Sequence, residues 1–89
     1  MEFEFDPNKS AGNKEKHGLD FTQAQTVWLD DNAINITSRE TPERRFMAIG
    51  RIGVVFWSVV WTERDGRHRI ISARRSRKNE EILYENARV

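Results

Sequence analysis

The stretch that most constrains the fold of this chain is an apolar run over residues 54–61. It is rich in β-branched and aromatic side chains and is broken only by Ser58, which is typical of a central strand covered on both faces. Asp65-Gly66 follows and is a strong signal for a two-residue hairpin turn. Residues 67–73 are therefore predicted to return as an antiparallel neighbour of the first strand.

Further strands are predicted where polar and apolar residues alternate. Residues 2–5 place Phe3 and Phe5 on one buried face, residues 34–37 form a short half-buried strand, and residues 45–51 form a third. The opening strand has no predicted strand beside it in sequence. It must therefore pair with a strand that is distant along the chain.

Two helices are predicted between the first two of these strands. The first begins at Asp6, whose carboxylate can cap backbone amides, and stops at Gly18, which suits a left-handed cap. It is very polar and offers only Ala11 as an apolar contact. The second has the capping-box form, with Asp20 as the cap and Gln23 three residues later.

A last helix completes the predicted domain. Ser76 can cap it, and we expect it to run to Arg88 with Ile82, Leu83 and Ala87 turned inward. The resulting order is β-α-α-β-β-β-α. The predicted fold class is therefore α+β, a compact domain in which the helices pack on one face of an antiparallel sheet.

Composition excludes several kinds of site. Residues 1–89 fit a single domain, and a chain of this size has little room for a deep active-site cavity. Cysteine is absent, which excludes disulfides, thiolate zinc sites and cysteine nucleophiles. With no signal peptide or membrane span expected, the cytoplasm is the predicted compartment. There is no Gly-rich phosphate loop, serine elbow or paired-histidine motif, so we expect neither a metal nor a cofactor.

Charge is divided unevenly along the chain. Residues 1–43 carry four basic against nine acidic side chains, a balance of −5, whereas residues 44–89 carry eleven against five, a balance of +6. Eleven of the fifteen basic residues are arginine, whose planar guanidinium suits bidentate phosphate contact. The second half is thus suited to bind an anion. Alternatively, the acidic half neutralises the basic half across the fold.

Seven basic residues fall within fifteen positions: Arg64, Arg67, Arg69, Arg74, Arg75, Arg77 and Lys78. Strict alternation along the last strand puts Arg67 and Arg69 on one face with Ile71 and Ala73, and His68, Ile70, Ser72 and Arg74 on the other. Side chains two positions apart are separated by about 6–7 Å, near the spacing of successive phosphates. Such a face can track a nucleic-acid backbone, or it is a solvated face that prevents edge aggregation.

A few other side chains are candidates for chemistry. His17 can act as an acid or base at neutral pH, or it only caps the first helix. Tyr84 can stack on a base or donate a proton, or it packs on the last helix. Trp57 and Trp61 share one strand face and are assigned to the core.

The sequence also carries a family resemblance that spans nearly the whole chain. It rests on Phe3-Glu4-Phe5-Asp6-Pro7-Asn8-Lys9, on Asn13, Lys16-His17-Gly18-Leu19-Asp20-Phe21, Ala24 and Val27, on Glu43-Arg44-Arg45-Phe46 with Ile49-Gly50, and on Thr62-Glu63-Arg64 and Arg69-Ile70-Ile71-Ser72-Ala73-Arg74-Arg75. Together these residues resemble the BrnT toxins of bacterial type II toxin–antitoxin systems, which are distant relatives of the RelE ribonucleases. Phe5 stands where the family often has tryptophan.

The resemblance implies a RelE-like α+β fold and a ribonuclease that inhibits translation. It also implies a cognate ribbon-helix-helix antitoxin, similar to BrnA, which neutralises the toxin in a hetero-oligomer and binds DNA. We therefore expect RNA as the substrate, DNA contact only through the antitoxin, and no membrane partner.

Our first hypothesis is a metal-independent endoribonuclease in which the RNA 2′-hydroxyl is the nucleophile. Arg64, Arg74 and Arg75 are expected to stabilise charge, His17 or Glu63 to act as the base, and Tyr84 or His68 as the acid. The expected RNA-binding residues are Lys14, Lys16, Arg67, Arg69, Arg77 and Lys78. A second hypothesis is a binding module without catalysis. A third is a structural subunit of a toxin–antitoxin repressor complex.

Overall fold

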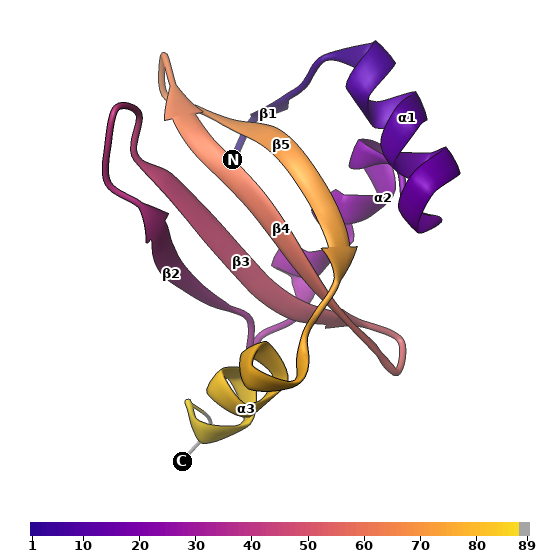
Figure 1. Cartoon of the computed structure of the whole chain (residues 1–89), viewed down its shortest axis with the longest axis vertical. Coiled ribbons are helices and arrows are strands. Elements are labelled where there is room, and N and C mark those ends of the chain that lie inside the picture. Colours follow the sequence, from indigo (N-terminus) through magenta and orange to yellow (C-terminus); the bar gives the residue numbers. More distant parts are fainter. Residues whose placement is uncertain (88–89) are drawn as a thin grey trace.

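The computed structural model describes residues 1–87 and contains one five-stranded sheet with helices at its periphery (Figure 1). The elements, in chain order, are β1 (Phe3–Glu4), α1 (Pro7–His17), α2 (Phe21–Ala24), the 3-10 helix η1 (Gln25–Leu29), β2 (Ile34–Arg39), β3 (Arg45–Ile52), β4 (Val55–Arg64), β5 (Arg67–Arg75) and α3 (Lys78–Asn86). The predicted α+β class is confirmed. The predicted order, β-α-α-β-β-β-α, omits one of the four strands that follow the helices, although the predicted residue ranges include all four.

The sheet has the strand order β1-β5-β4-β3-β2, so the apolar strand β4 lies at its centre as predicted. Strands β2 to β5 form an antiparallel meander, and β1 runs parallel to β5 through the pairs Phe3–His68 and Glu4–Arg69. The opening strand β1 thus pairs with the distant strand β5 and forms one edge of the sheet. Asp65 and Gly66 both have positive φ, 54° and 78°, which is the geometry of the predicted hairpin turn.

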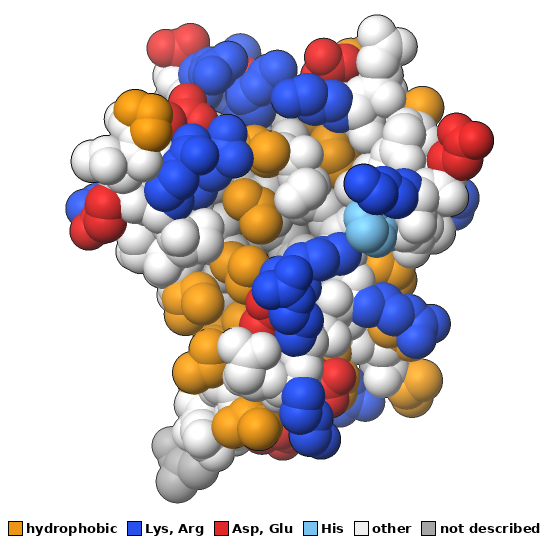
Figure 2. All heavy atoms as spheres, viewed as in Figure 1, with side chains coloured by type: hydrophobic (Ala, Val, Ile, Leu, Met, Phe, Trp, Pro, Cys, Tyr) orange, Lys and Arg blue, Asp and Glu red, His pale blue; other side chains and the backbone are white. Residues whose placement is uncertain are grey.

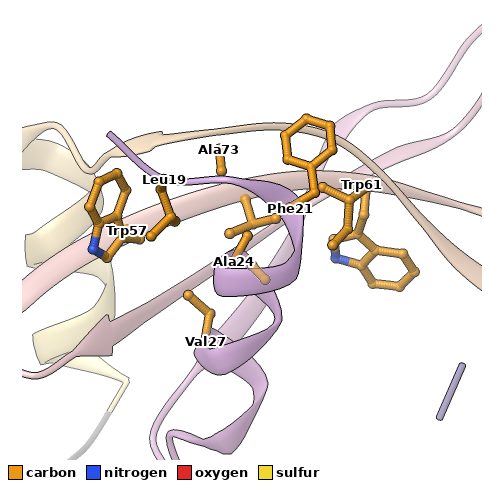
Figure 3. Close-up of a cluster of buried hydrophobic side chains, with 10 residues drawn as sticks. Leu19, Phe21, Ala24, Val27, Trp57, Trp61 and Ala73 are labelled. Carbon is orange, nitrogen blue, oxygen red and sulfur yellow. The ribbon is translucent and has the colours of Figure 1, made fainter. Parts of the chain in front are cut away.

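One face of the sheet carries the main hydrophobic core, which α2 and η1 cover (Figure 3). Phe21, Ala24 and Val27 of these helices belong to the same buried cluster as Trp57 and Trp61 of β4. Phe21, Ala24 and Val27 are spaced three positions apart, which places them on one side of a helical segment. Trp57 and Trp61 are four positions apart on a strand, an even number, and so share one face of the sheet. The assignment of Trp57 and Trp61 to the core is confirmed.

The helix α3 lies on the opposite face, so the prediction that all helices pack on one face is wrong. Its Tyr84 packs with Met47 and Ile49 of β3 in a second, smaller apolar cluster. Ala48, between these two residues, belongs to the main core. Neighbouring residues of a strand point to opposite faces, and α3 is therefore separated from α2 by the thickness of the sheet.

The inward face of α3 also differs from the prediction. Ile82, Leu83 and Ala87 are exposed, whereas Glu80 and Tyr84 are buried. Glu80 and Tyr84 face inward because both form hydrogen bonds with side chains outside the helix. The residue that precedes the helix is Arg77 rather than the predicted cap Ser76, and the Ser76 hydroxyl bonds that of Ser58 instead. The predicted end of the helix at Arg88 lies outside the described residues.

The polar helix α1 is attached to the domain by side-chain amide and hydroxyl groups. The Asn13 side chain donates to the Leu19 and Ala73 carbonyls at 2.7 and 2.8 Å and accepts from the Ala73 amide at 3.2 Å. The Ser10 hydroxyl accepts from the Phe21 amide at 2.9 Å. Ala11 is exposed, so the predicted apolar contact is wrong. The Asp6 cap of this helix is confirmed.

The caps at the end of α1 and the start of α2 follow the sequence prediction. Gly18 is left-handed at φ 82°, and Asp20 and Gln23 form the predicted capping box. Neither motif needs distant contacts, because each satisfies backbone groups within a few residues of itself.

A bulge in β5 changes which of its residues share a face. Val60 pairs with Ser72 and Trp61 pairs with Ile70, which leaves Ile71 as an extra residue. Ile70 and Ala73, three positions apart, therefore both enter the main core. Strict alternation is wrong beyond Ile71, because a bulge reverses the phase of a strand. As a result Arg74 lies on the same face as Arg67 and Arg69.

Candidate anion-binding site

A small cavity of about 170 Å³ lies on the same sheet face as α3, in the part that α3 does not cover. We call it the basic pocket. Its lining comes from α1, the loop before β3, and strands β3, β4 and β5, and consists of Lys9, Glu43, Arg45, Thr62, Arg64, Arg69 and Ile71. Figure 2 shows lysine and arginine side chains gathered on this side of the molecule. The lining is mostly polar and charged.

Strand register brings the arginines of the pocket together. Thr62 pairs with Arg69, and Arg64 pairs with Arg67, on adjacent antiparallel strands. Arg45 begins β3, two positions before Met47, which pairs with Val60. Because residues two apart share a face, Arg45, Arg64 and Arg69 project to the same side.

The charges of the pocket are unbalanced in favour of the cations. The Glu43 carboxylate lies 3.4 Å from Arg64 Nη2 and 3.7 Å from Arg45 Nε. Within residues 1–87, Lys9 forms no ion pair with an acidic side chain. In the same described part of the chain, Arg45 Nε is buried and has no hydrogen-bond partner, although buried polar atoms normally have one. The excess of positive charge in the pocket therefore favours the binding of an anion.

Arg67, and Arg69 of the pocket lining, pair with the acidic first part of the chain. Arg69 Nη1 lies 2.8 Å from Glu4, and Arg67 Nε lies 3.1 Å from Glu2. These pairs join β5 to the segment that contains β1, and the hydrogen bond to Glu2 raises the pKa of Arg67. The neutralisation that we considered from composition thus operates at the edge of the sheet.

Arg74, predicted to stabilise charge in catalysis, lies in a different environment. Its two terminal nitrogens donate to both carboxylate oxygens of Glu80 at 2.8 Å. Glu80 also accepts from the Ser58 hydroxyl and the Arg77 amide, both at 2.8 Å. The Arg74 hydrogen bonds, foremost among these contacts, lower the pKa of Glu80 to about 2. We call Arg74, Glu80, Ser58 and Ser76 the α3 cluster.

The residues predicted as acid and base do not line the basic pocket. Tyr84 is buried, and its hydroxyl donates to Asp30 Oδ2 at 2.8 Å. His68 stacks on Trp61 with ring centroids 4.1 Å apart, and burial lowers its pKa. Glu63 pairs with His68 across β4 and β5. His17 is exposed at the end of α1.

The other predicted basic residues lie at the surface, away from the lining of the pocket. Arg75, Arg77 and Lys78 are exposed where β5 leads into α3. Lys14 and Lys16 are exposed on α1, and the Lys14 ammonium donates to the Gln23 side chain at 3.0 Å. Of the predicted site residues, the pocket brings together only Arg64 and Arg69.

Sequence reasoning did not select Lys9, Glu43 and Arg45, which complete the pocket. They lie outside the arginine-rich segment 64–78 and come from two segments more than thirty positions apart. The signal that includes them is the family resemblance, because Lys9 and Glu43-Arg44-Arg45 are among the residues that carry it.

The fold and pocket together define a small α+β domain with a surface site for an anionic ligand. The family model described as "Ribonuclease toxin, BrnT, of type II toxin-antitoxin system" matches residues 5–80. The chain therefore belongs to the BrnT family of ribonuclease toxins. No curated protein matches the sequence. Among the helices in the described part of the chain, none has the length and apolar character needed to cross a membrane.

Proposed function

We propose that this BrnT-family chain is an endoribonuclease that cleaves RNA at the basic pocket without a metal ion. The observation that carries the proposal is the convergence of Lys9, Arg45, Arg64 and Arg69 from four different elements on one cavity. The family description supplies ribonuclease activity, a type II system and hence an antitoxin partner. The convergence of cations supplies a place for the phosphate.

The chemistry needs little more than such a site. RNA carries its own nucleophile, the 2′-hydroxyl, so the protein must orient the strand, move protons and stabilise the additional charge on the phosphorane. Arg45 and Arg64 are our candidates for charge stabilisation, because the two guanidinium groups share one carboxylate, Glu43, at 3.7 and 3.4 Å. Lys9 is suited to hold the neighbouring phosphate, and Arg69, whose Nη1 alone bonds Glu4, adds positive charge beside it.

The remaining basic residues form an extended binding surface in this proposal. Arg75, Arg77 and Lys78 are exposed beyond the pocket and would contact the strand as it continues past the scissile phosphate. Arg74 has a structural role instead, because Glu80 already engages both of its terminal nitrogens.

The biological setting follows from the family. Cleavage of RNA would inhibit translation in the cytoplasm. A ribbon-helix-helix antitoxin similar to BrnA would neutralise the toxin in a hetero-oligomer. These features, together with likeness of the fold to RelE, rest on the resemblance stated above. The second candidate, an RNA-binding subunit without catalysis, is favoured by the same excess of cations.

Product chemistry separates the two candidates. The purified chain is incubated in EDTA with end-labelled RNA and with a matched oligonucleotide in which a single 2′-deoxy residue replaces the nucleotide before the cleaved bond. We expect products with cyclic phosphate ends from the RNA and no cleavage at the substituted position. Retention of RNA without cleavage supports the binding subunit. Loss of activity in EDTA contradicts metal independence.

A further inference from the structure

We propose that Glu43 is the general base of the basic pocket, the group that removes the proton from the RNA 2′-hydroxyl. This inference rests on the proposed function. Among the residues that the structure describes, Glu43 is the one carboxylate in the lining of the pocket. It was not selected from the sequence, because nothing in the local pattern distinguishes it from Glu40 in the same loop.

The position of Glu43 suits a base that must meet substrate. Its side chain is 39% exposed, so a 2′-hydroxyl can approach it from solvent. Its carboxylate lies 3.4 Å from Arg64 and 3.7 Å from Arg45. These are the two guanidinium groups that we assign to the phosphate. A group next to both is within reach of a 2′-oxygen whose phosphate occupies the pocket, as a base must be.

The charged surroundings of Glu43 come from every neighbouring element. On the pocket side it faces cations, namely Lys9 of α1, Arg45 of β3, Arg64 of β4 and Arg69 of β5. On its other side it borders a second hollow with Arg44, Glu63 and Asp65. Arg39 Nε donates to the Glu43 backbone carbonyl at 3.5 Å, which ties the loop to β2.

The step balances without a cofactor. A Glu43 carboxylate oxygen takes the 2′-hydroxyl proton as O2′ forms a bond to phosphorus. The bond from phosphorus to O5′ breaks, O5′ leaves with the electron pair, and it takes a proton from water. The products are a 2′,3′-cyclic phosphate and a 5′-hydroxyl end. Glu43 then releases its proton to solvent and is ready for another turnover.

A competing role for Glu43 is that of a placeholder anion, which occupies the phosphate position until RNA arrives. Both roles predict that removal of the negative charge leaves RNA binding intact or makes it tighter. They differ in kcat, because a placeholder performs no chemistry. The two readouts must therefore be measured separately.

The test compares Glu43→Gln with Glu40→Gln. The control is matched because Glu40 lies in the same loop, loses the same charge and, among the described residues, pairs only with the exposed Arg44. Binding is measured with a fully 2′-deoxy oligonucleotide that cannot react, and kcat with the RNA of the same sequence. For Glu43→Gln we expect a loss of about 10²-fold or more in kcat, with affinity for the deoxy oligonucleotide equal to or above that of the parent. Glu40→Gln should retain the kcat of the parent.

Several outcomes overturn the inference. Parental kcat in Glu43→Gln, with or without tighter binding, shows a placeholder or a bystander. An equal loss of kcat in Glu40→Gln shows an effect of loop charge. Glu43→Asp keeps a carboxylate, and its failure to recover any activity over Glu43→Gln also counts against a base. If the parent chain itself cleaves no RNA, the proposed function fails and this inference fails with it, which is distinct from loss in the variant alone.

Discussion

Two carboxylates on the same face of the sheet differ in their burial and in their distance from arginine. In the α3 cluster, Glu80 is 5% exposed and accepts four hydrogen bonds of 2.8 Å, two of them from Arg74. In the basic pocket, Glu43 is 39% exposed in its side chain and lies 3.4 and 3.7 Å from Arg64 and Arg45. Glu80 therefore has its full set of hydrogen-bond donors. The arginines beside Glu43 can still bind a further anion.

The difference separates arginines that hold the fold from arginines that await a ligand. A buried carboxylate must be paired and hydrogen-bonded, because an uncompensated charge there is costly. Glu80 meets this demand and attaches α3 to β4 and β5. The cations of the basic pocket exceed their acidic partners, and Arg45 Nε finds no hydrogen-bond acceptor within residues 1–87. Sequence places Arg64 and Arg74 in one array, yet their surroundings assign them different roles.

The largest effect expected from this comparison is on stability. Glu80→Ala leaves Arg74 half-buried without its partner, and we expect the free energy of unfolding to fall by about 3 kcal/mol. Urea denaturation measures the change. The control is Glu40→Ala, which removes an exposed pair with Arg44 and should cost less than about 1 kcal/mol. Equal losses in the two variants would contradict the assignment of the α3 cluster as structural.

The next effect is on catalysis. Arg64→Ala removes a guanidinium from the basic pocket, and we expect kcat for RNA cleavage to fall about 100-fold, because a donor to the developing charge is lost. Stability should change by less than about 1 kcal/mol, since Arg64 is half exposed. Arg44→Ala, which removes a neighbouring exposed arginine outside the pocket, is the matched control. Cleavage at the parental rate in Arg64→Ala would exclude this arginine from the site.

The smallest effect is the dependence of stability on pH. The pKa of Glu80 is lowered from 4.5 to about 2 in the folded protein. A lowered pKa stabilises the fold above pH 4.5, and that stabilisation is lost as the pH falls from 4.5 toward 2. We expect a loss of about 2 kcal/mol across this range in the parent, measured by urea denaturation at each pH. A Glu80→Gln variant should show a clearly flatter profile, and an unchanged slope would rule out Glu80 as its source.

Much of the local structure could be predicted from sequence, because its causes are local. The Asp20 capping box, the left-handed Gly18 and the Asp65-Gly66 turn all satisfy backbone groups within a few positions. The apolar run of β4 predicted a central strand, and β4 occupies the centre of the sheet. The α+β class followed from this sequence of elements.

The errors arose where distant contacts override local pattern. The inward face of α3 is the reverse of the expected one, with Ile82 and Leu83 exposed and Glu80 buried. The hydrogen bonds of Glu80 to Ser58 and Arg74 outweigh the apolar pattern of the helix. The bulge at Ile71 depends on the register of two strands and has no signal in one strand alone.

The candidate site shows the same division. Sequence alone determined the class of the fold, several caps and turns and an excess of arginine in the second half, because periodicity, turn chemistry and charge are properties of neighbouring residues. Tertiary structure alone decided which arginines gather in the basic pocket and which bond a buried carboxylate. It placed Lys9 and Glu43 beside Arg45, Arg64 and Arg69, and it paired Arg74 with Glu80. Electrostatic environment depends on distance in space, which only the packed sheet defines.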